Sequence, residues 1–257
     1  MEKPIILLDT DMDTDCDDAG ALAILLEAHL AGKATLLGIV ADSVSPHAAP
    51  ACDYMTRHYG IELPIGTVYA EDYMDTPENL ARFADYRTHS KNCLQQGRAY
   101  NAFFARQINK TDKDYPSAVK VYRQLLCKAE DRSVTVLCVG MLTAVAEALE
   151  SGPDEISSFS GAELFKRKVK KVIAMGNPYG INDFNWGKDA LGAKQFFDLC
   201  PMLRMPAWWC KHSAGHGALI PALWCTPSAK DGAPMPFPMV HGGRRLWCTA
   251  AMLGLYL

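Results

Sequence analysis

The chain alternates short apolar runs with segments of helical length, and this alternation constrains its fold more than any other feature. Residues 4–9 read Pro-Ile-Ile-Leu-Leu-Asp, a continuous apolar run that ends in a carboxylate and is typical of a strand buried on both faces. Further strands are expected at residues 35–41, 63–68, 134–139, 171–175 and 205–210, and helices at 17–30, 45–59, 116–129, 142–149 and 190–199. The pattern predicts an α/β fold with a mainly parallel sheet flanked by helices.

The length of 257 residues suits one large core, so we expect a single domain over residues 1–257. Residues 71–115 are polar and charged and have no clean periodicity. They are interpreted as an insertion, either a lid near a site or a solvated stretch of surface. Residues 211–243 are rich in glycine and proline, which predicts mostly loop.

Charge and cysteine usage exclude several classes of protein. The net charge is −3, so the chain has no basic footprint for nucleic acid. Its nine cysteines are scattered, with no Cys-x-x-Cys pair, and no signal peptide precedes them. This favours reduced thiols and a cytoplasmic location. We expect no membrane segment, because no uninterrupted apolar stretch is long enough to cross a bilayer.

Six aspartates stand in the ten residues 9–18, directly after the first apolar run. Such blocks are usually solvated or disordered. Here a buried-strand pattern precedes the block and a helical pattern follows it, with Asp17 and Asp18 placed where a helix N-terminus favours acids. Packing so many like charges is unfavourable unless a cation or protons offset the repulsion. Carboxylate oxygens indicate a hard ion such as calcium or magnesium.

Two interpretations of this block compete with the one given next. A calcium-binding EF-hand loop needs glycine at its sixth position and glutamate at its twelfth, whereas Thr14 and Gly20 stand there. A strand that ends in Asp-x-Asp also resembles haloacid dehalogenase-type phosphatases, with Asp9 as nucleophile and Asp11 as acid. That pattern expects threonine or valine at Asp13 and later lysine and acid-pair motifs, which this chain does not show clearly. It stays the alternative enzyme.

Four segments, in order along the chain, carry a more specific resemblance. They are the Asp-rich run with its flanks at residues 6–22, the strand and Gly-Met-Leu-Thr turn at 133–143, Met-Gly at 175–176 with Asp-Phe-Asn at 183–185, and Trp-Cys-Thr-Ala at 247–250. Together they resemble the inosine–uridine nucleoside hydrolase family, in the branch with two extra residues before the Asp-Asp pair. The resemblance implies a nucleoside hydrolase-like fold over nearly the whole chain.

That resemblance implies a hydrolase that breaks the N-glycosidic bond of ribonucleosides with a calcium-bound water, as in purine and pyrimidine salvage. Carried over residue by residue, Asp11 and Asp18 would be side-chain ligands of the calcium ion and Val139 would give its carbonyl. Cys248 stands where the family has its last aspartate ligand. Asp11 would also act as the general base that takes the proton of the attacking water.

The resemblance further assigns a set of residues to the ribose of a small-molecule nucleoside. The substrate-binding residues would be Asp17, Asp42, Met175, Asp183 and Asn185. Structural roles compete with these, since Asp17 would cap a helix, Asp42 and Asn185 would form turns, and Met175 would fill the core. Three histidines of the late loop region would protonate a purine leaving group or lie in the core or at the surface: His212, His216 and His241. A homo-oligomer is left open.

Several residues depart from the family pattern. Asp13 replaces a glycine, which adds charge beside the metal, and Cys248 replaces an aspartate with a poor calcium ligand. The chain stops at Leu257 where relatives continue, so we expect a shortened C-terminus. These departures leave a second hypothesis open, that the chain is a calcium- or sugar-binding relative without turnover.

Overall fold

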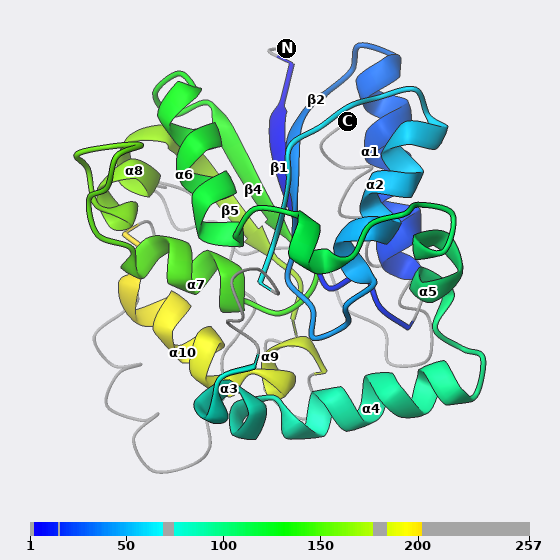
Figure 1. Cartoon of the computed structure of the whole chain (residues 1–257). Coiled ribbons are helices and arrows are strands. Elements are labelled where there is room, and N and C mark those ends of the chain that lie inside the picture. The colour runs from blue at the N-terminus through cyan, green and yellow to red at the C-terminus, as the bar shows by residue number, and fades with distance from the viewer. Residues whose placement is uncertain (1–2, 15, 69–74, 177–183, 202–257) are drawn as a thin grey trace, which may run out of the picture.

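The centre of the fold is a five-stranded sheet in which every neighbouring pair of strands is parallel. The computed structural model describes residues 3–14, 16–68, 75–176 and 184–201. The strands lie in the order β3-β2-β1-β4-β5 (Figure 1). Their bounds are β1 Ile5–Thr10, β2 Thr35–Ala41, β3 Ile65–Thr67, β4 Val134–Cys138 and β5 Val169–Ala174.

Helices connect these strands and cover both faces of the sheet (Figure 1). They are α1 Asp17–Leu30, α2 Ala48–His58, α3 Pro77–Arg82, α4 Ala84–Gln95, α5 Tyr100–Ala105, the 3-10 turn η2 Asp112–Asp114, α6 Ala118–Lys128, α7 Thr143–Glu150, α8 Gly161–Lys168, α9 Asn185–Lys188 and α10 Ala190–Leu199. The predicted α/β class with a mainly parallel sheet is therefore confirmed. Among the described helices, none has both the length and the apolar content to cross a membrane.

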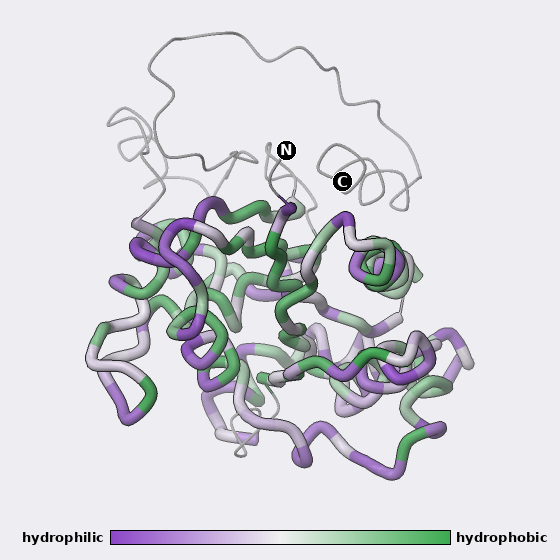
Figure 2. Tube along the Cα trace, turned by 90° about the horizontal axis from the view of Figure 1, so that it is seen from above, coloured by the Kyte–Doolittle hydropathy of each residue, from purple (hydrophilic) through white to green (hydrophobic). Residues whose placement is uncertain are grey.

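Alternate residues of the strands enter two separate cores, one on each face. Leu7 and Val136 pack with α6, α7 and α10, whereas Leu8 and Leu137 pack with α1 and α2. The strands are thus apolar on both faces, which explains why each reads as a continuous apolar run. Figure 2 looks down on the same arrangement and shows hydrophobic residues on the inner elements and hydrophilic ones toward the outside.

The strand order reverses at β1, whose connection to β2 leads to one side and whose other neighbour is β4. At such a switch point the loops that follow the two strands separate, and this leaves a crevice at their carboxyl ends where ligands of open α/β sheets bind. The Asp-rich segment follows β1 at this position. The topology therefore places the Asp-rich segment at the carboxyl ends of the strands, where ligands of this kind of fold bind.

Helix α2 begins later than the sequence indicates. The Ser-Pro pair at Ser45 predicts a cap with proline in the first turn, but α2 starts at Ala48 with His47 as its N-cap residue. Ser45 instead forms a turn before the helix, in which its carbonyl accepts a hydrogen bond from Ala48 N (3.3 Å). Its hydroxyl accepts a bond from Asn101 Nδ2 (2.9 Å), and this contact with α5 is not visible in the local pattern.

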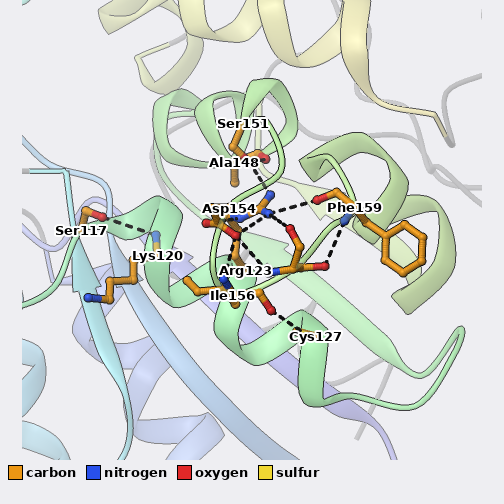
Figure 3. Close-up of polar contacts among 10 residues, drawn as sticks. Ser117, Lys120, Arg123, Cys127, Ala148, Ser151, Asp154, Ile156 and Phe159 are labelled. Atoms are coloured by element: carbon orange, nitrogen blue, oxygen red, sulfur yellow. Dashed lines mark hydrogen bonds and ion pairs between the residues drawn. The ribbon is translucent and has the colours of Figure 1, made fainter.

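A buried arginine fixes the loop between α7 and α8 (Figure 3). Arg123 of α6 is 2% exposed, and its Nε and Nη2 donate to the two carboxylate oxygens of Asp154 at 2.7 and 2.8 Å. Its guanidinium also donates to Ser151 Oγ and to the carbonyls of Ser157 and Phe159. Arginine offers five donors in a rigid fork, so one side chain satisfies four partners in this loop.

Asp112 of η2 links the end of β3 to the start of α2. One carboxylate oxygen accepts a hydrogen bond from Thr67 Oγ1 (2.9 Å) and the other accepts one from Ala49 N (3.0 Å). Burial raises the pKa of this carboxyl to about 7, although both hydrogen bonds act to lower it. Between about pH 4 and pH 7 the folded state therefore keeps a proton on Asp112 that the unfolded chain, with a pKa of about 3.9, has lost.

We expect Asp112 to make the protein less stable as pH rises from about 4 to about 7. In this range the folded state binds more protons than the unfolded state, so the free energy of unfolding falls with pH, by at most about 1.4 kcal/mol per pH unit for one group. Asp112→Asn removes the titration. Its amide oxygen can accept from Ala49 N, and its amide nitrogen can donate to Thr67 Oγ1, which reverses that bond. Urea unfolding at about pH 5 and pH 8 should show a smaller pH dependence in this variant. The same pH dependence in both proteins would contradict the assignment.

Candidate functional site

The aspartates at the end of β1 and directly after it are buried. The described ones are 0 to 7% exposed: Asp9, Asp11, Asp13, Asp17 and Asp18. Asp9 is the last residue but one of the central strand, and Asp17 and Asp18 open helix α1. Burial of so many carboxylates is costly unless donors or cations compensate it. The hydrogen-bond partners of each carboxylate therefore indicate which kind of ligand the site could bind.

Asp18 is fixed by the end of β1. The hydroxyl of Thr10 donates to Asp18 Oδ1 over 2.5 Å, which joins the strand to the first turn of α1. Asp17 and Asp18 occupy that first turn, where the positive end of the helix dipole favours carboxylates. The prediction that these two acids open a helix is confirmed.

Asp11 lies against the turn that follows β4. A Cβ atom built on Gly140 would be 2.4 Å from Asp11 Oδ1 and 2.6 Å from its Cβ, so only glycine leaves room for this side chain. On its other side, the hydroxyl of Tyr86 in α4 donates to Asp11 Oδ2 over 3.3 Å. The carboxylate of Asp11 is thus placed between the ends of β1 and β4 and helix α4.

The ends of β4 and β5 are joined to the same region. Val139 N donates to Asp9 O (2.9 Å) and Asn185 Nδ2 donates to Val139 O (3.0 Å). Met175 follows β5, and its N donates to Cys138 O (2.8 Å). The structure therefore brings Val139 and Asn185 into direct contact and places Met175 at the neighbouring strand end, as the parallel sheet predicts.

Asp42 follows β2 and is as buried as the aspartates after β1. It is 0% exposed, and its Oδ2 accepts a hydrogen bond from Ala144 N (2.8 Å) at the start of α7. Burial raises the pKa of Asp42 to about 7 against the effect of that hydrogen bond. Burial and then the charge of Asp42 raise the pKa of Asp9, whose Oδ2 accepts from Tyr122 (2.5 Å). Asp42 Oδ2 thus holds the start of α7, whereas Asp42 Oδ1 is buried without a hydrogen-bond partner among the described residues. The assignment of Asp42 to the ribose stays a prediction.

Asp13, which stands where the family has glycine, contacts residues that the sequence did not single out. Its Oδ1 accepts hydrogen bonds from Ser90 Oγ of α4 (3.0 Å) and Asn101 Nδ2 of α5 (3.4 Å). Asn101 also donates to Met12 O (3.1 Å) and is 0% exposed. The polar segment at 71–115 therefore supplies hydrogen-bond donors to the Asp-rich loop. Its irregular pattern gave no signal for these contacts, because they depend on residues about 80 positions apart.

Some of the predicted site residues lie outside the described residues. These are Asp183, Cys248 and the three histidines at 212, 216 and 241. Within the described ranges, no three His, Cys, Asp or Glu side chains form a group that could hold a metal ion. The two side-chain ligands expected from the first motif are both described and buried, and Cys248 is the expected ligand that is not.

Comparison with known proteins bears directly on this arrangement. The family model described as inosine-uridine preferring nucleoside hydrolase matches residues 6–229, which is most of the chain. The chain belongs to this family. No curated protein sequence matches it closely. Membership in the nucleoside hydrolase family confirms the resemblance. The match spans the first three of the four segments, and residues 247–250 lie beyond it.

Two solved structures share the fold. The effector protein XOO4466 superposes with a TM-score of 0.55 at 15% identity, over 77% of this chain and 54% of that one. A plant nucleoside hydrolase, PpNRh1, superposes with a TM-score of 0.51 at 18% identity, over 76% of this chain and 57% of that one. The chain thus spans little more than half the length of either neighbour. At these identities the likeness concerns the fold.

The nucleoside hydrolase family is metal-dependent. The oxygen atoms at the ends of β1 and β4 are of the kind that ligates metal ions. Asp11 and Asp18 offer carboxylate oxygens and Val139 a carbonyl oxygen, which are the ligands of hard cations. Burial of these carboxylates is a further sign, since a cation is one way to offset their repulsion. The residues present therefore fit a hard divalent ion better than zinc or copper.

Proposed function

We propose that this protein hydrolyses the N-glycosidic bond of ribonucleosides or related N-ribosides. One observation carries the proposal. The carboxylate of Asp11 lies at the switch point of the sheet, between the Gly140 turn and Tyr86, with Val139 and Asn185 at the neighbouring strand end. A carboxylate held in one orientation, with further oxygen atoms beside it, can act as a general base on a water next to a sugar.

Calcium is the ion that we propose for the site. Asp11, Asp18 and the Val139 carbonyl would hold it, with Cys248 at the position of a further ligand. When bound, the ion would lower the pKa of a coordinated water and bind ribose hydroxyls. A thiol is a poor ligand for calcium, so we expect weaker binding than in a site with aspartate at position 248.

The side chains then have separate roles. Asp11 takes the proton of the attacking water as general base, because it is the carboxylate held by both β4 and α4. Asn185 donates a hydrogen bond from Nδ2 to Val139 O, and its Oδ1 would accept a hydrogen bond from a ribose hydroxyl. Asp17 at the start of α1 would accept from another hydroxyl, and Met175 would pack beside the sugar. Asp183 completes the proposed set.

The partner that we propose is a small-molecule nucleoside, in nucleoside salvage in the cytoplasm, with no nucleic acid or membrane involved. Whether the functional unit is a homo-oligomer is decided by size-exclusion chromatography with light scattering.

A second candidate function rests on Asp13. Its buried carboxylate stands where the family has glycine, and α4 and α5 donate to it. An added charge next to the general base alters the site that performs the chemistry, so a calcium- or sugar-binding protein without turnover is the alternative.

Release of reducing sugar from a panel of ribonucleosides tests the proposal. We expect turnover that is lost after treatment with a chelator and restored by calcium, because the metal supplies the activated water. Calorimetry should show calcium binding that is weakened at least about tenfold in Asp18→Ala, since a charged ligand is lost. Asp198→Ala, an exposed acid on α10, is the matched control. Binding without sugar release would support the alternative, and unchanged binding in Asp18→Ala would reject the metal site.

A further inference from the structure

Helix α4 places a buried tyrosine against the proposed general base. Tyr86 is 1% exposed, and its ring packs edge-on against Phe184 with 5.8 Å between centroids. Its hydroxyl lies 3.3 Å from Asp11 Oδ2. A carboxylate can only accept and tyrosine has one proton to give, so the direction of this bond is fixed. A hydrogen bond to a charged acceptor is stronger than one between neutral groups.

Ser43, which follows Asp42 after β2, lies beside the hydroxyl of Tyr86. It acts to lower the pKa of Tyr86, which burial raises well above its usual value. Ser43 Oγ accepts a hydrogen bond from Ser45 N (3.1 Å), so this serine is itself held by the backbone after β2. The surroundings of the tyrosine hydroxyl are therefore polar on the side of β2 as well as on the side of Asp11.

The two oxygens of Asp11 are thus constrained from different elements. Oδ1 lies against Gly140 after β4, and Oδ2 accepts from Tyr86 on α4. Rotation of the carboxylate would break the contact with Tyr86 or clash with the turn after β4. A group held in this way keeps one orientation toward a bound water, and orientation is a large part of catalytic effect.

Helix α4 is itself held by polar contacts of residues on either side of Tyr86. Ser90 lies four residues after Tyr86 on the same face and donates to Asp13 Oδ1 (3.0 Å). Lys188 of α9 forms an ion pair with Asp85. Asp13 therefore has a use in this chain that the glycine of the family pattern cannot provide, because it ties α4 to the loop that carries Asp11.

We infer that Tyr86 is a positioning residue for Asp11, and that the Asp13–Ser90 contact holds α4 so that the tyrosine hydroxyl reaches the carboxylate. The inference rests on the proposed role of Asp11 in the hydrolysis of ribonucleosides. It gives helix α4 a function, since the face that carries Tyr86 is a fixed wall of the site while most of the helix is solvated. A purely structural tyrosine would need its ring, whereas this role needs its hydroxyl.

Tyr86→Phe separates the two roles because it removes the hydroxyl and keeps the ring. We expect kcat to fall roughly tenfold with KM changed little, since the bond orients the base and does not bind the substrate. The free energy of unfolding should fall only by the contribution of this one hydrogen bond, because the ring and its packing are kept. Tyr54→Phe is the control, because Tyr54 on α2 stacks on Phe104 at 5.6 Å. Unchanged kcat with a lower unfolding midpoint would overturn the inference and leave Tyr86 as a packing residue.

A double-mutant cycle tests the contact independently of turnover. The free energies of unfolding of Tyr86→Phe, Asp11→Asn and the double variant are measured in urea, with and without calcium. We expect non-additive effects, because either substitution alone removes the charged hydrogen bond. Additive effects would reject the inference whatever the activity. If the wild type releases no sugar but the cycle is non-additive, the hydrolase proposal fails while the contact between Tyr86 and Asp11 stands.

Discussion

Asp11→Asn should lower kcat for ribonucleoside hydrolysis at least about a hundredfold. The amide cannot take a proton from water, and general-base catalysis alone contributes about 10² to 10⁴. It is also a weaker ligand for a hard cation than a carboxylate, so the loss of metal affinity adds to the effect. Because the side chain keeps its shape, the space beside Gly140 and the contact with Tyr86 remain filled.

Steady-state release of reducing sugar at saturating calcium measures this effect. Asp198→Asn makes the same chemical change on the exposed end of α10 and should leave kcat unchanged. If Asp11→Asn turned over as fast as the wild type while its calcium binding fell, Asp11 would be a ligand only, and another group would be the base.

Most of the fold could be predicted from the sequence because its strands are buried on both faces. The apolar runs at 4–9 and 134–139 anticipate β1 and β4 to within about a residue, and residues 190–199 coincide with α10. Helix α8 was not predicted, although Ser160 and Glu163 form a capping box at its start. The start of α2 was misplaced because Ser45 bonds to α5 in place of capping its own helix.

For the candidate site, the positions that could be predicted are those where a local motif coincides with a strand end. Asp11, Asp18 and Val139 follow β1 and β4, so the parallel sheet alone predicts that they lie near one another. The hydrogen-bond partners on helices α4 and α5 were not predictable from the sequence. Tyr86, Ser90 and Asn101 reach the Asp-rich loop through tertiary packing across about 75 to 90 residues, and no periodicity marks them. The hydrogen bond from Ala144 N to Asp42 Oδ2 was not predictable either, because it joins residues about 100 positions apart.

Gly140→Ala should reduce hydrolysis about a hundredfold without any change to a group that reacts. The added Cβ would lie 2.4 Å from Asp11 Oδ1 and 2.6 Å from Asp11 Cγ, distances that real Cβ atoms do not show. The turn after β4 is held by the sheet, so the Asp11 side chain is the part that must move. A shift of about 1 Å in a catalytic group costs up to about 10² in rate. Calcium affinity should fall as well, because Asp11 is a proposed ligand.

Gly152→Ala is the matched control, since a Cβ at that position has no atom within 4 Å. Both variants should keep a cooperative urea transition, and only Gly140→Ala should lose turnover and calcium affinity. Tyr86→Phe in the Gly140→Ala background adds a direct check. Once the added methyl has displaced the carboxylate, its hydrogen bond to Tyr86 is already lost, so the second substitution should cost little further activity. Full activity in Gly140→Ala would mean that the Asp11 carboxylate can leave this position and still act, and the fixed orientation on which the proposed mechanism depends would be wrong.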